Sequence, residues 1–432
     1  MGLPERGVRT TFRISLLILL GSLLHAFSAT VPESAKMPTF AKDIAPILQN
    51  KCQDCHHDGT SAPMSLVSYE EVRPWAKAIK ARVIARTMPP WFIDPSVGIH
   101  EFKDNMSLTS DQISTIVRWI DSGSPRGEMK DMPAAREFPS NDAWSLEKRF
   151  GKPDLIIESA PYTMRAKDQD QWWRPIGDLN LDEPGWVRAM ELHPTTLGRT
   201  ITHHAIAHVI EPGSGVRSAD ETGALMSYGM GKQYDIFEKD TGRLLIPGSK
   251  VSWDIHYRAG DEDITDFVQL AVWFYPKGQE PKHHAVWTGF GPGTRLDIDP
   301  NTIAESNSNT VLKSAACFSS FQPHMHRRGK AMTIEAIVPD GQKQQISSVD
   351  RYNFNWIMNY VYADDAVPCF PKGTTIHVTA WHDNTAANRD NPDPLQWVGY
   401  GDRTVDEMAI AFVNVTPISD EEYSAWAATH KR

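Results

Sequence analysis

Residues 52–56 read Cys-Gln-Asp-Cys-His, and this C-x-x-C-H stretch decides how the N-terminal third of the chain folds. Two thiols at this spacing can each bond to a haem vinyl group, and the adjacent imidazole can reach the iron as an axial ligand. A zinc knuckle half or a redox dithiol has the same spacing. Zinc would need a second ligand pair nearby, and the next cysteine is Cys317. We therefore interpret Cys52, Cys55 and His56 as the attachment site of a covalently bound c-type haem.

The sequence around this motif has a helical pattern from residue 36 to residue 128. Ser68 precedes a stretch with apolar residues at helical spacing, and Ser110 is the expected cap of a later helix that ends near Gly123. Short helices around C-x-x-C-H are typical of a small all-α cytochrome c domain, which we expect for this range.

Met88, in the segment Thr87-Met88-Pro89-Pro90-Trp91, is the expected second axial ligand of the iron. A soft thioether suits haem iron, and two prolines would end the preceding helix and stiffen the loop. Met64, Met106 and His100 are alternative ligands, and any of them could instead serve only in packing or lie at the surface.

Residues 1–28 have the pattern of a secretory signal peptide, with three arginines before the apolar run Ile14–Leu24 and small residues at the cleavage positions. That run is shorter than the roughly 20 apolar residues of a membrane-spanning helix, so no stable span is expected in the mature chain. The predicted location is a bacterial periplasm or the cell exterior. A net charge of −10 without basic runs argues against a nucleic-acid partner.

Two cysteines, Cys317 and Cys369, remain outside the haem motif. In an oxidising compartment they can form a disulfide, and the alternative is a pair of buried free thiols. We expect the disulfide.

Short alternating runs replace the helical pattern after residue 150. They are separated by Gly, Pro, Asp and Asn, as in Lys250–Tyr257, and this rhythm is typical of antiparallel sandwiches or jelly rolls. The polar segment Asp299–Asn309 is expected to divide the region into two all-β domains. The expected ranges are a linker at 129–150, a first β domain at 151–298 and a second at 310–418.

Histidines of the β region gather in three places. His324 and His326 would face the same side of a strand about 6.6 Å apart, close enough to bind one metal, unless they only line an exposed polar face. His203 and His204 are adjacent, so on a flat strand they point to opposite faces and need a bulge to share a metal. His256 lies on the polar face of its run, either as a ligand or simply in contact with water.

In chain order, these segments resemble the copper type II, ascorbate-dependent monooxygenases, the family of peptidylglycine hydroxylating and dopamine β-monooxygenases. The shared pattern is a His-His pair, a His-Tyr, a His-x-His and an Asp-Glu-Met near the C-terminus. Here it is carried by His203-His204, His256-Tyr257, His324-Met325-His326-Arg327-Arg328-Gly329-Lys330 and Thr404-Val405-Asp406-Glu407-Met408. The resemblance implies two tandem jelly-roll domains, each binding one copper, that face each other across a wet cleft.

The resemblance also implies roles for six side chains. A first copper, for electron transfer, would be bound by His203, His204 and His256, and a second, where O₂ binds, by His324, His326 and Met408. Three imidazoles suit both oxidation states of copper, and a thioether favours Cu(I). Met408 could instead be core filler. His208 has no counterpart in the family pattern.

Two departures from the family bear on function. Gln322 stands where peptide-hydroxylating members have an arginine, and Ile410 and Phe412 replace polar residues, which favours a small uncharged or aromatic substrate. The haem motif suggests that electrons from a periplasmic donor enter through the haem instead of from ascorbate. The sequence therefore predicts an exported copper monooxygenase that hydroxylates a C–H bond with O₂. The alternatives are a non-catalytic electron-transfer or copper-handling protein, and a binding module in which the histidines are incidental.

Overall fold

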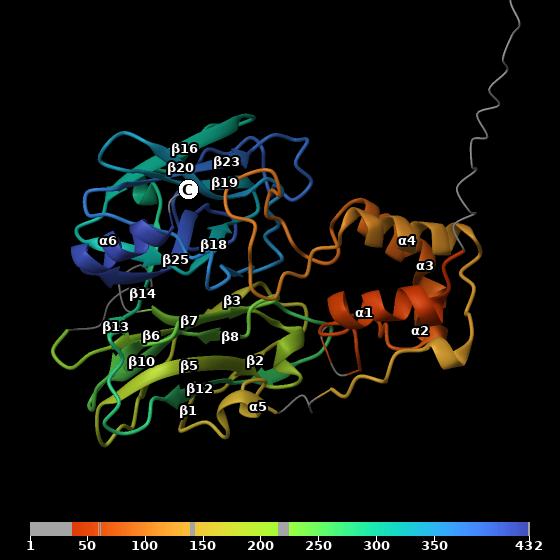
Figure 1. The fold of residues 1–432 in the computed structure, drawn as a ribbon, viewed down its shortest axis with the longest axis horizontal. Helices are drawn as coiled ribbons and strands as arrows, with labels where there is room; N and C mark the ends of the chain where they lie inside the picture. The colour runs from red at the N-terminus through yellow and green to blue at the C-terminus, as the bar shows by residue number, and fades with distance from the viewer. Residues whose placement is uncertain (1–36, 59, 61, 139–142, 215–223, 431–432) are drawn as a thin grey trace, which may run out of the picture. The chain divides into compact units, whose positions relative to one another are not determined.

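The computed structural model describes residues 37–430 except 59, 61, 139–142 and 215–223, so the predicted signal peptide lies outside the described residues. The chain is mostly β-sheet with few helices, which come mainly before the strands (Figure 1). Every described helix and strand falls in the compact unit Pro38–Arg432. Among the described residues, no helix has the length and apolar character needed to cross a membrane.

The helices near the start of this unit surround a small apolar core that includes Phe40, Leu48, Val72 and Trp119. The elements are η1 (Phe40–Ile44), α1 (Ala45–Lys51), α2 (Tyr69–Val72), η2 (Arg73–Trp75), α3 (Ala76–Ile84) and α4 (Ser110–Asp121).

Two of these helices begin with a capping box. Ser68 caps α2, as expected, together with the Glu71 side chain. The cap of α4 is Thr109 and not Ser110, because Gln112 lies three residues after Thr109 and completes the reciprocal pair of hydrogen bonds.

The chain between α3 and α4 leaves the helical core. Phe92, Ile93 and Ile99 belong to the buried cluster of the C-terminal β region, and Ile93 forms an isolated β-bridge with Val349. The range 36–128 therefore contributes to two cores, because its extended segment after the two prolines has no helical face with which to pack.

The first pair of sheets encloses one buried cluster, to which Val187 and Leu270 contribute from one sheet and Ala205 and Trp253 from the other. One sheet has the order β1 (Leu155–Glu158), β12 (Val268–Phe274), β5 (Gly185–Pro194), β9 (Thr241–Leu245) and β13 (His283–His284), with β8 (Tyr234–Ile236) on β5. The other has the order β3 (Gln171–Trp173), β10 (Lys250–Tyr257), β6 (Thr202–Ile210) and β7 (Ala224–Gly229), with β4 (Ile176–Asp178) on β10. A small ribbon pairs β2 (Tyr162–Met164) with β11 (Ile264–Asp266), and η4 is Gly198–Thr200.

The second pair of sheets encloses a larger cluster, with Phe318 and Ala411 from one sheet and Ile334 and Val378 from the other. One sheet has the order β21 (Tyr360–Val361), β18 (Ser320–Met325), β25 (Ala409–Ile418), β17 (Ala315–Phe318) and β22 (Cys369–Phe370), with β14 (Val286–Phe290) on β25. The other has the order β16 (Ile303–Val311), β23 (Thr375–Asp383), β19 (Gly329–Ile337) and β20 (Lys343–Val349). The remaining elements are η3 (Met129–Asp131), α5 (Glu147–Phe150), η5 (Gly293–Arg295), β15 (Asp297–Ile298), β24 (Val398–Gly399) and α6 (Asp420–Thr429).

The second β region begins earlier in the sequence than the segment Asp299–Asn309, which was expected to divide the two regions. β14, inside the range 151–298, pairs with β25 of the second region. The segment Asp299–Asn309, expected to divide the domains, contains most of the edge strand β16, which pairs only with β23 among the described strands. An edge strand tolerates polar residues because one of its sides faces solvent.

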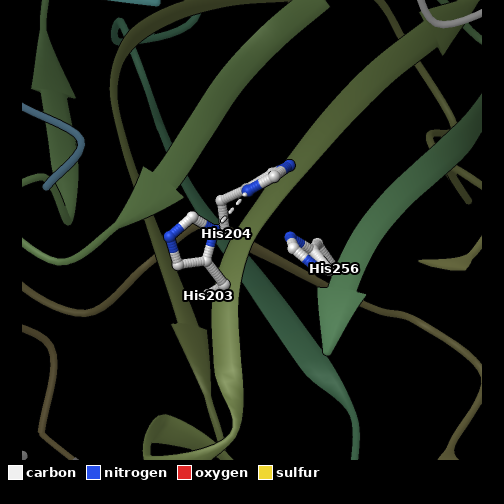
Figure 2. A group of neighbouring side chains, drawn as sticks. All are labelled: His203, His204 and His256. Carbon is white, nitrogen blue, oxygen red and sulfur yellow. Dashed lines mark hydrogen bonds between the residues drawn. The ribbon is translucent and has the colours of Figure 1, made fainter. Parts of the chain in front are cut away.

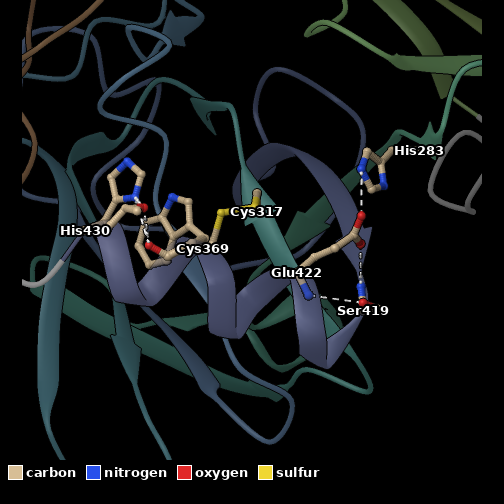
Figure 3. The surroundings of a disulfide bond; sticks show 8 residues. His283, Cys317, Cys369, Ser419, Glu422 and His430 are labelled. Atoms are coloured by element: carbon tan, nitrogen blue, oxygen red, sulfur yellow. Dashed lines mark hydrogen bonds and ion pairs between the residues drawn. A yellow bond between two sulfur atoms is a disulfide. The ribbon is translucent and has the colours of Figure 1, made fainter.

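The disulfide expected from the sequence is present. Cys317 on β17 and Cys369 on β22 lie opposite each other in the register and are bonded, beside helix α6 (Figure 3). The bond closes a loop with a sequence separation of 52 residues. It therefore links β17, which leads into β18, to the neighbouring strand β22, which lies far along the sequence.

We expect that replacing both Cys317 and Cys369 with serine lowers the free energy of unfolding by about 2–4 kcal/mol, because the loop closed by the bond no longer restricts the unfolded chain. Urea unfolding of the oxidised protein and of the double variant measures the difference. Ser314→Ala, a change near β17 outside the bond, is the control, and equal midpoints for all three proteins would contradict the prediction.

Candidate metal centre

Three histidines predicted to bind a first metal come together in the structure. His203 and His204 lie on β6 and His256 on the neighbouring β10, and their ligand atoms all lie within 4.8 Å of one another (Figure 2). This is the one such group of His, Cys, Asp and Glu found among the described residues.

A register shift brings the adjacent pair to one place. His256 is opposite His204, but the next residue of β10, Tyr257, is opposite Thr202, so His203 has no partner on β10. This irregularity is the bulge that two adjacent ligands require, because it turns the His203 side chain out of the strict alternation.

Hydrogen bonds hold Nε2 of His203 and of His256, and a further one joins His203 Nδ1 to His204 Nδ1 (Figure 2). His203 Nε2 donates to the Phe354 carbonyl oxygen at 3.2 Å, and His256 Nε2 donates to Asp170 Oδ2 at 3.0 Å. The buried His256 Nδ1 has no hydrogen-bond partner in the described part of the chain. His203 Nδ1 and His204 Nδ1 are 3.1 Å apart, a spacing that suits two nitrogens each about 2 Å from one ion.

The protonation of these imidazoles also fits a metal ion. Burial lowers the pKa of His203 to about 2 and that of His204 well below its usual value, with nearby positive groups adding to the effect. Both rings are therefore neutral at neutral pH, the form in which histidine binds a metal. The three residues could therefore bind a metal ion.

His324, His326 and Met408, the second predicted set, all line one cavity. His324 is on β18 and His326 follows the strand end, with ring centroids 5.4 Å apart and planes at 88°. His326 Nδ1 donates to the Asp406 carbonyl oxygen at 3.1 Å, which leaves Nε2 for a ligand. Met408 lines the same cavity as both rings. Burial lowers the pKa of His324 to about 3 and that of His326 to about 4.

Glu407 and His382, which were assigned no role from the sequence, form hydrogen bonds with the backbone of the second set. Glu407 is fully buried and accepts hydrogen bonds from the backbone nitrogens of His326 at 2.9 Å and Arg328 at 2.6 Å. Burial raises the pKa of Glu407 to about 7. His382 Nε2 donates to the Met408 carbonyl oxygen at 3.1 Å. The Asp-Glu-Met motif is thus fixed to the His-x-His turn by its glutamate.

The two histidine sets adjoin. The ring centroids of His204 and His324 are 6.3 Å apart, and the Phe354 ring lies 4.7 Å from His203 and 5.9 Å from His326. Both sets contribute to a cavity of about 420 Å³, within the range of small-molecule sites. The residues that line this cavity include possible metal ligands and apolar side chains: His204, His324, His326, Met408, Ile410 and Phe412.

The C-x-x-C-H residues lie in and after the turn that follows α1. Cys52 and Cys55 are free thiols. His56 Nδ1 donates to the Met64 carbonyl oxygen at 3.0 Å, which leaves its Nε2 as the nitrogen that could bind a metal.

Met88 is a lining residue of a different part of the described chain's surface. It lines a second cavity, of about 530 Å³, together with the alternative ligand His100. Cys52, Cys55 and His56 are absent from the described residues that line this cavity. The roles predicted for Cys52, Cys55, His56 and Met88 therefore stay predictions.

Comparisons with known proteins do not identify a family for this chain. No protein-family model matches the chain, and no curated protein matches it. Among solved structures, an α-L-fucosidase from Bacteroides ovatus shares 9% identity over 71% of this chain and 44% of its own, with a TM-score of 0.17. The exported protein XepA shares 9% identity over 53% of this chain and 86% of its own, with a TM-score of 0.18. The VP2 particle of infectious bursal disease virus shares 7% identity over 61% and 72%, with a TM-score of 0.17. At these scores the likenesses carry no argument about fold or function.

We expect that Asp170→Ala weakens Cu(II) binding at the first site by about 10–100-fold, because the carboxylate orients the His256 ring through Nε2. Titration against a competing chelator measures this, and the second site provides an internal reference. Asp168→Ala, two residues away and exposed, is the matched control. Equal affinities for the Asp170 variant and the unaltered protein would show that the carboxylate does not position the ligand.

Proposed function

We propose that this protein is an exported, copper-dependent monooxygenase that hydroxylates a C–H bond of a small, uncharged molecule. One oxygen atom of O₂ would enter the C–H bond and the other would leave as water, with two electrons and two protons supplied by a periplasmic donor. The observation that carries the proposal is the meeting of His203, His204 and His256, whose ligand atoms all lie within 4.8 Å of one another, directly beside His324.

Six residues would bind the two coppers. The first would be held by His203, His204 and His256, and the second by His324, His326 and Met408. When bound, copper supplies the one-electron chemistry by which O₂ is activated and a C–H bond is oxidised. This assignment is supported by the neutral state of the buried imidazoles and by the four motifs shared in order with the copper type II monooxygenases.

The other residues of the cavity would bind the substrate and limit the access of water. Ile410 and Phe412 line the cavity beside Met408, and Trp287 stacks on Phe412 at 4.3 Å. Gln322 also lines it, and its Oε1 accepts a hydrogen bond from the buried Lys232 at 3.2 Å. That lysine is already paired with Asp235 at 2.9 Å, so it does not present a free charge to a substrate carboxylate.

We further propose that the helical region is a cytochrome c domain and that the two β regions are jelly rolls. Cys52 and Cys55 would hold the haem covalently, His56 would be one axial ligand, and Met88 the expected second. Haem supplies an entry point for electrons in this scheme. The Cys317–Cys369 bond agrees with an oxidising compartment such as the periplasm.

We expect one haem and two coppers for each exported chain, measured by a pyridine haemochrome spectrum and by metal analysis. With ascorbate or a reduced cytochrome as donor, ¹⁸O₂ and a panel of small alkylbenzenes and alkylphenols, one ¹⁸O atom should appear in the alcohol product. Copper-independent turnover would contradict the proposal. Full copper and haem without any reaction of the reduced protein with O₂ would instead support an electron-transfer or copper-handling protein.

We expect that Met408→Leu lowers product formation at least about tenfold and weakens Cu(I) binding at the second site, because leucine keeps the volume but removes the thioether. Met325→Leu is the matched control, since Met325 lies between His324 and His326 in sequence and is fully buried in the apolar cluster. Product formation and Cu(I) affinity are measured on both variants. Equal losses in the two would show that Met408 only packs.

A further inference from the structure

The chain that follows Met88 lies against the edge of the second β region. The backbone nitrogen of Ile99 donates to the Ile346 carbonyl oxygen at 2.9 Å. Ile346 is on β20, the last strand of its sheet. Gly98 allows this close approach, because its φ is +72° and a Cβ there would lie 2.4 Å from the same carbonyl oxygen. The segment between α3 and α4 therefore joins the helical region to the second β region.

The helical core and this segment share a cavity of about 530 Å³, a volume that suits a cofactor. Val83 and Leu108 line it from the helical core, and Trp91 and Ile93 line it from the segment. Cys52 is not among the described residues that line the cavity, but it packs against the same helical core as Val83 and Leu108. One wall of the cavity is therefore formed by the core on which Cys52 packs.

A hydrogen bond also connects the C-x-x-C-H motif with the cavity. Lys51, directly before Cys52, donates from Nζ to the Asn105 carbonyl oxygen at 2.5 Å. Asn105 lines the cavity. The motif that is predicted to attach haem therefore begins near this cavity.

The side chains that line the cavity combine apolar walls with groups that bind iron or carboxylates. These groups are the thioether of Met88, the imidazole of His100 and the guanidinium groups of Arg86 and Arg351. Haem is a flat, mostly apolar ring with a central iron and two propionate carboxylates. A thioether or an imidazole suits the iron, and a guanidinium suits a carboxylate. The donor set of the cavity therefore fits haem.

Arg351 belongs to the second β region, and the backbone next to it is held in place. The Tyr352 hydroxyl donates to the Met325 carbonyl oxygen at 2.6 Å and accepts from the Met325 nitrogen at 3.1 Å. Arg351 Nε donates to Asp350 Oδ1 at 3.2 Å. The terminal amino groups of a guanidinium can bind a carboxylate side by side, so Arg351 can hold a propionate while it keeps this contact.

The charge of Arg351 lies near the part of the cavity that Trp91 forms. Burial raises the pKa of Tyr360, and the hydrogen bond with Phe92 and the charge of Arg351 oppose this rise. The Tyr360 hydroxyl accepts from the Phe92 nitrogen at 3.1 Å, and its ring meets Trp91 edge to face with centroids 4.9 Å apart. The Arg351 guanidinium is therefore close to the Trp91 wall.

We propose that this cavity holds the haem between the helical core and the second β region, and that Arg351 binds one of its propionates. This inference rests on the proposed function, because it adds a residue to the cytochrome part of that proposal. The residues after Arg351 contact both histidine sets: Tyr352 bonds to Met325 beside the second set, and the Phe354 carbonyl oxygen accepts from His203 of the first. A haem in this cavity would therefore adjoin the segment that connects with both candidate copper sites.

Redox titration of the haem in the full exported chain tests the role of Arg351. A positive charge near the haem favours the reduced iron, so Arg351→Gln should lower the equilibrium constant for reduction about three- to tenfold, or about 30–60 mV. Arg351→Lys should recover part of this loss, because lysine keeps the charge but not the planar fork. Arg389→Gln removes an exposed arginine of the same β region and should leave the potential unchanged.

Methyl NMR of the full chain, labelled at isoleucine, tests where the haem lies without altering the cavity. Ile113 and Ile93 line the cavity, the first from α4 and the second from the segment bridged to β20. Ferric iron is paramagnetic, so both signals should shift and broaden between the ferrous and ferric forms. Ile303 is exposed on β16, at the opposite edge of the sheet from β20, and its signal should not change. Ile→Val variants assign the signals.

The inference is overturned if Arg351→Gln keeps the potential of the unaltered protein. It is also overturned if Ile113 responds to the ferric iron and Ile93 does not, because the haem would then lie in the helical region alone.

Failure of this inference and failure of the proposed function have different signatures. Copper content and ¹⁸O incorporation are measured on the same samples. Copper with product, together with an unchanged potential in Arg351→Gln, would overturn the role of Arg351 alone. The expected potentials and methyl shifts in a chain without copper would support the haem position and contradict the monooxygenase. A chain exported without haem would contradict both the inference and the cytochrome domain.

Discussion

A one-residue irregularity between β6 and β10 is the constraint on which the candidate site depends. Regular pairing would place the His203 and His204 side chains on opposite faces of the sheet. Because Tyr257 pairs with Thr202 while His256 pairs with His204, His203 is left outside the ladder and its imidazole reaches the other two. The core face of β10 remains regular, with Trp253 and Tyr257 buried in the apolar cluster, so the sandwich absorbs the irregularity without loss of its core.

The contact between the two β regions completes the site. Phe354 of the second region accepts the hydrogen bond from His203 of the first, and its ring also packs near His326. Close approach is possible because Gly229 lacks a side chain: a Cβ there would lie 2.4 Å from the Ile357 side chain. The orientation of the first histidine set and the closeness of the second therefore depend on the same interface.

Several features could be predicted from the chain because they depend on local pattern. The alternation of β10 correctly separates its core face from the face that carries His256. The adjacency of His203 and His204 demanded a bulge if they were to meet, and one is present. An oxidising compartment was expected from the sequence, and it led us to predict the disulfide between Cys317 and Cys369. That disulfide is confirmed. The expected divider between the β regions was misplaced, since polar composition describes an edge strand as well as a linker.

The sequence by itself determined the kinds of side chains available and their spacing along single elements: the C-x-x-C-H motif, the histidine groups and the strand rhythm. Only the tertiary structure decided which of them meet. Asp170, Phe354, Glu407 and His382 act through atoms contributed by distant segments, including backbone carbonyls and nitrogens, which carry no residue-specific signal. Hydrogen bonds between distant segments depend on how the sheets pack, so a pattern along one strand cannot specify them.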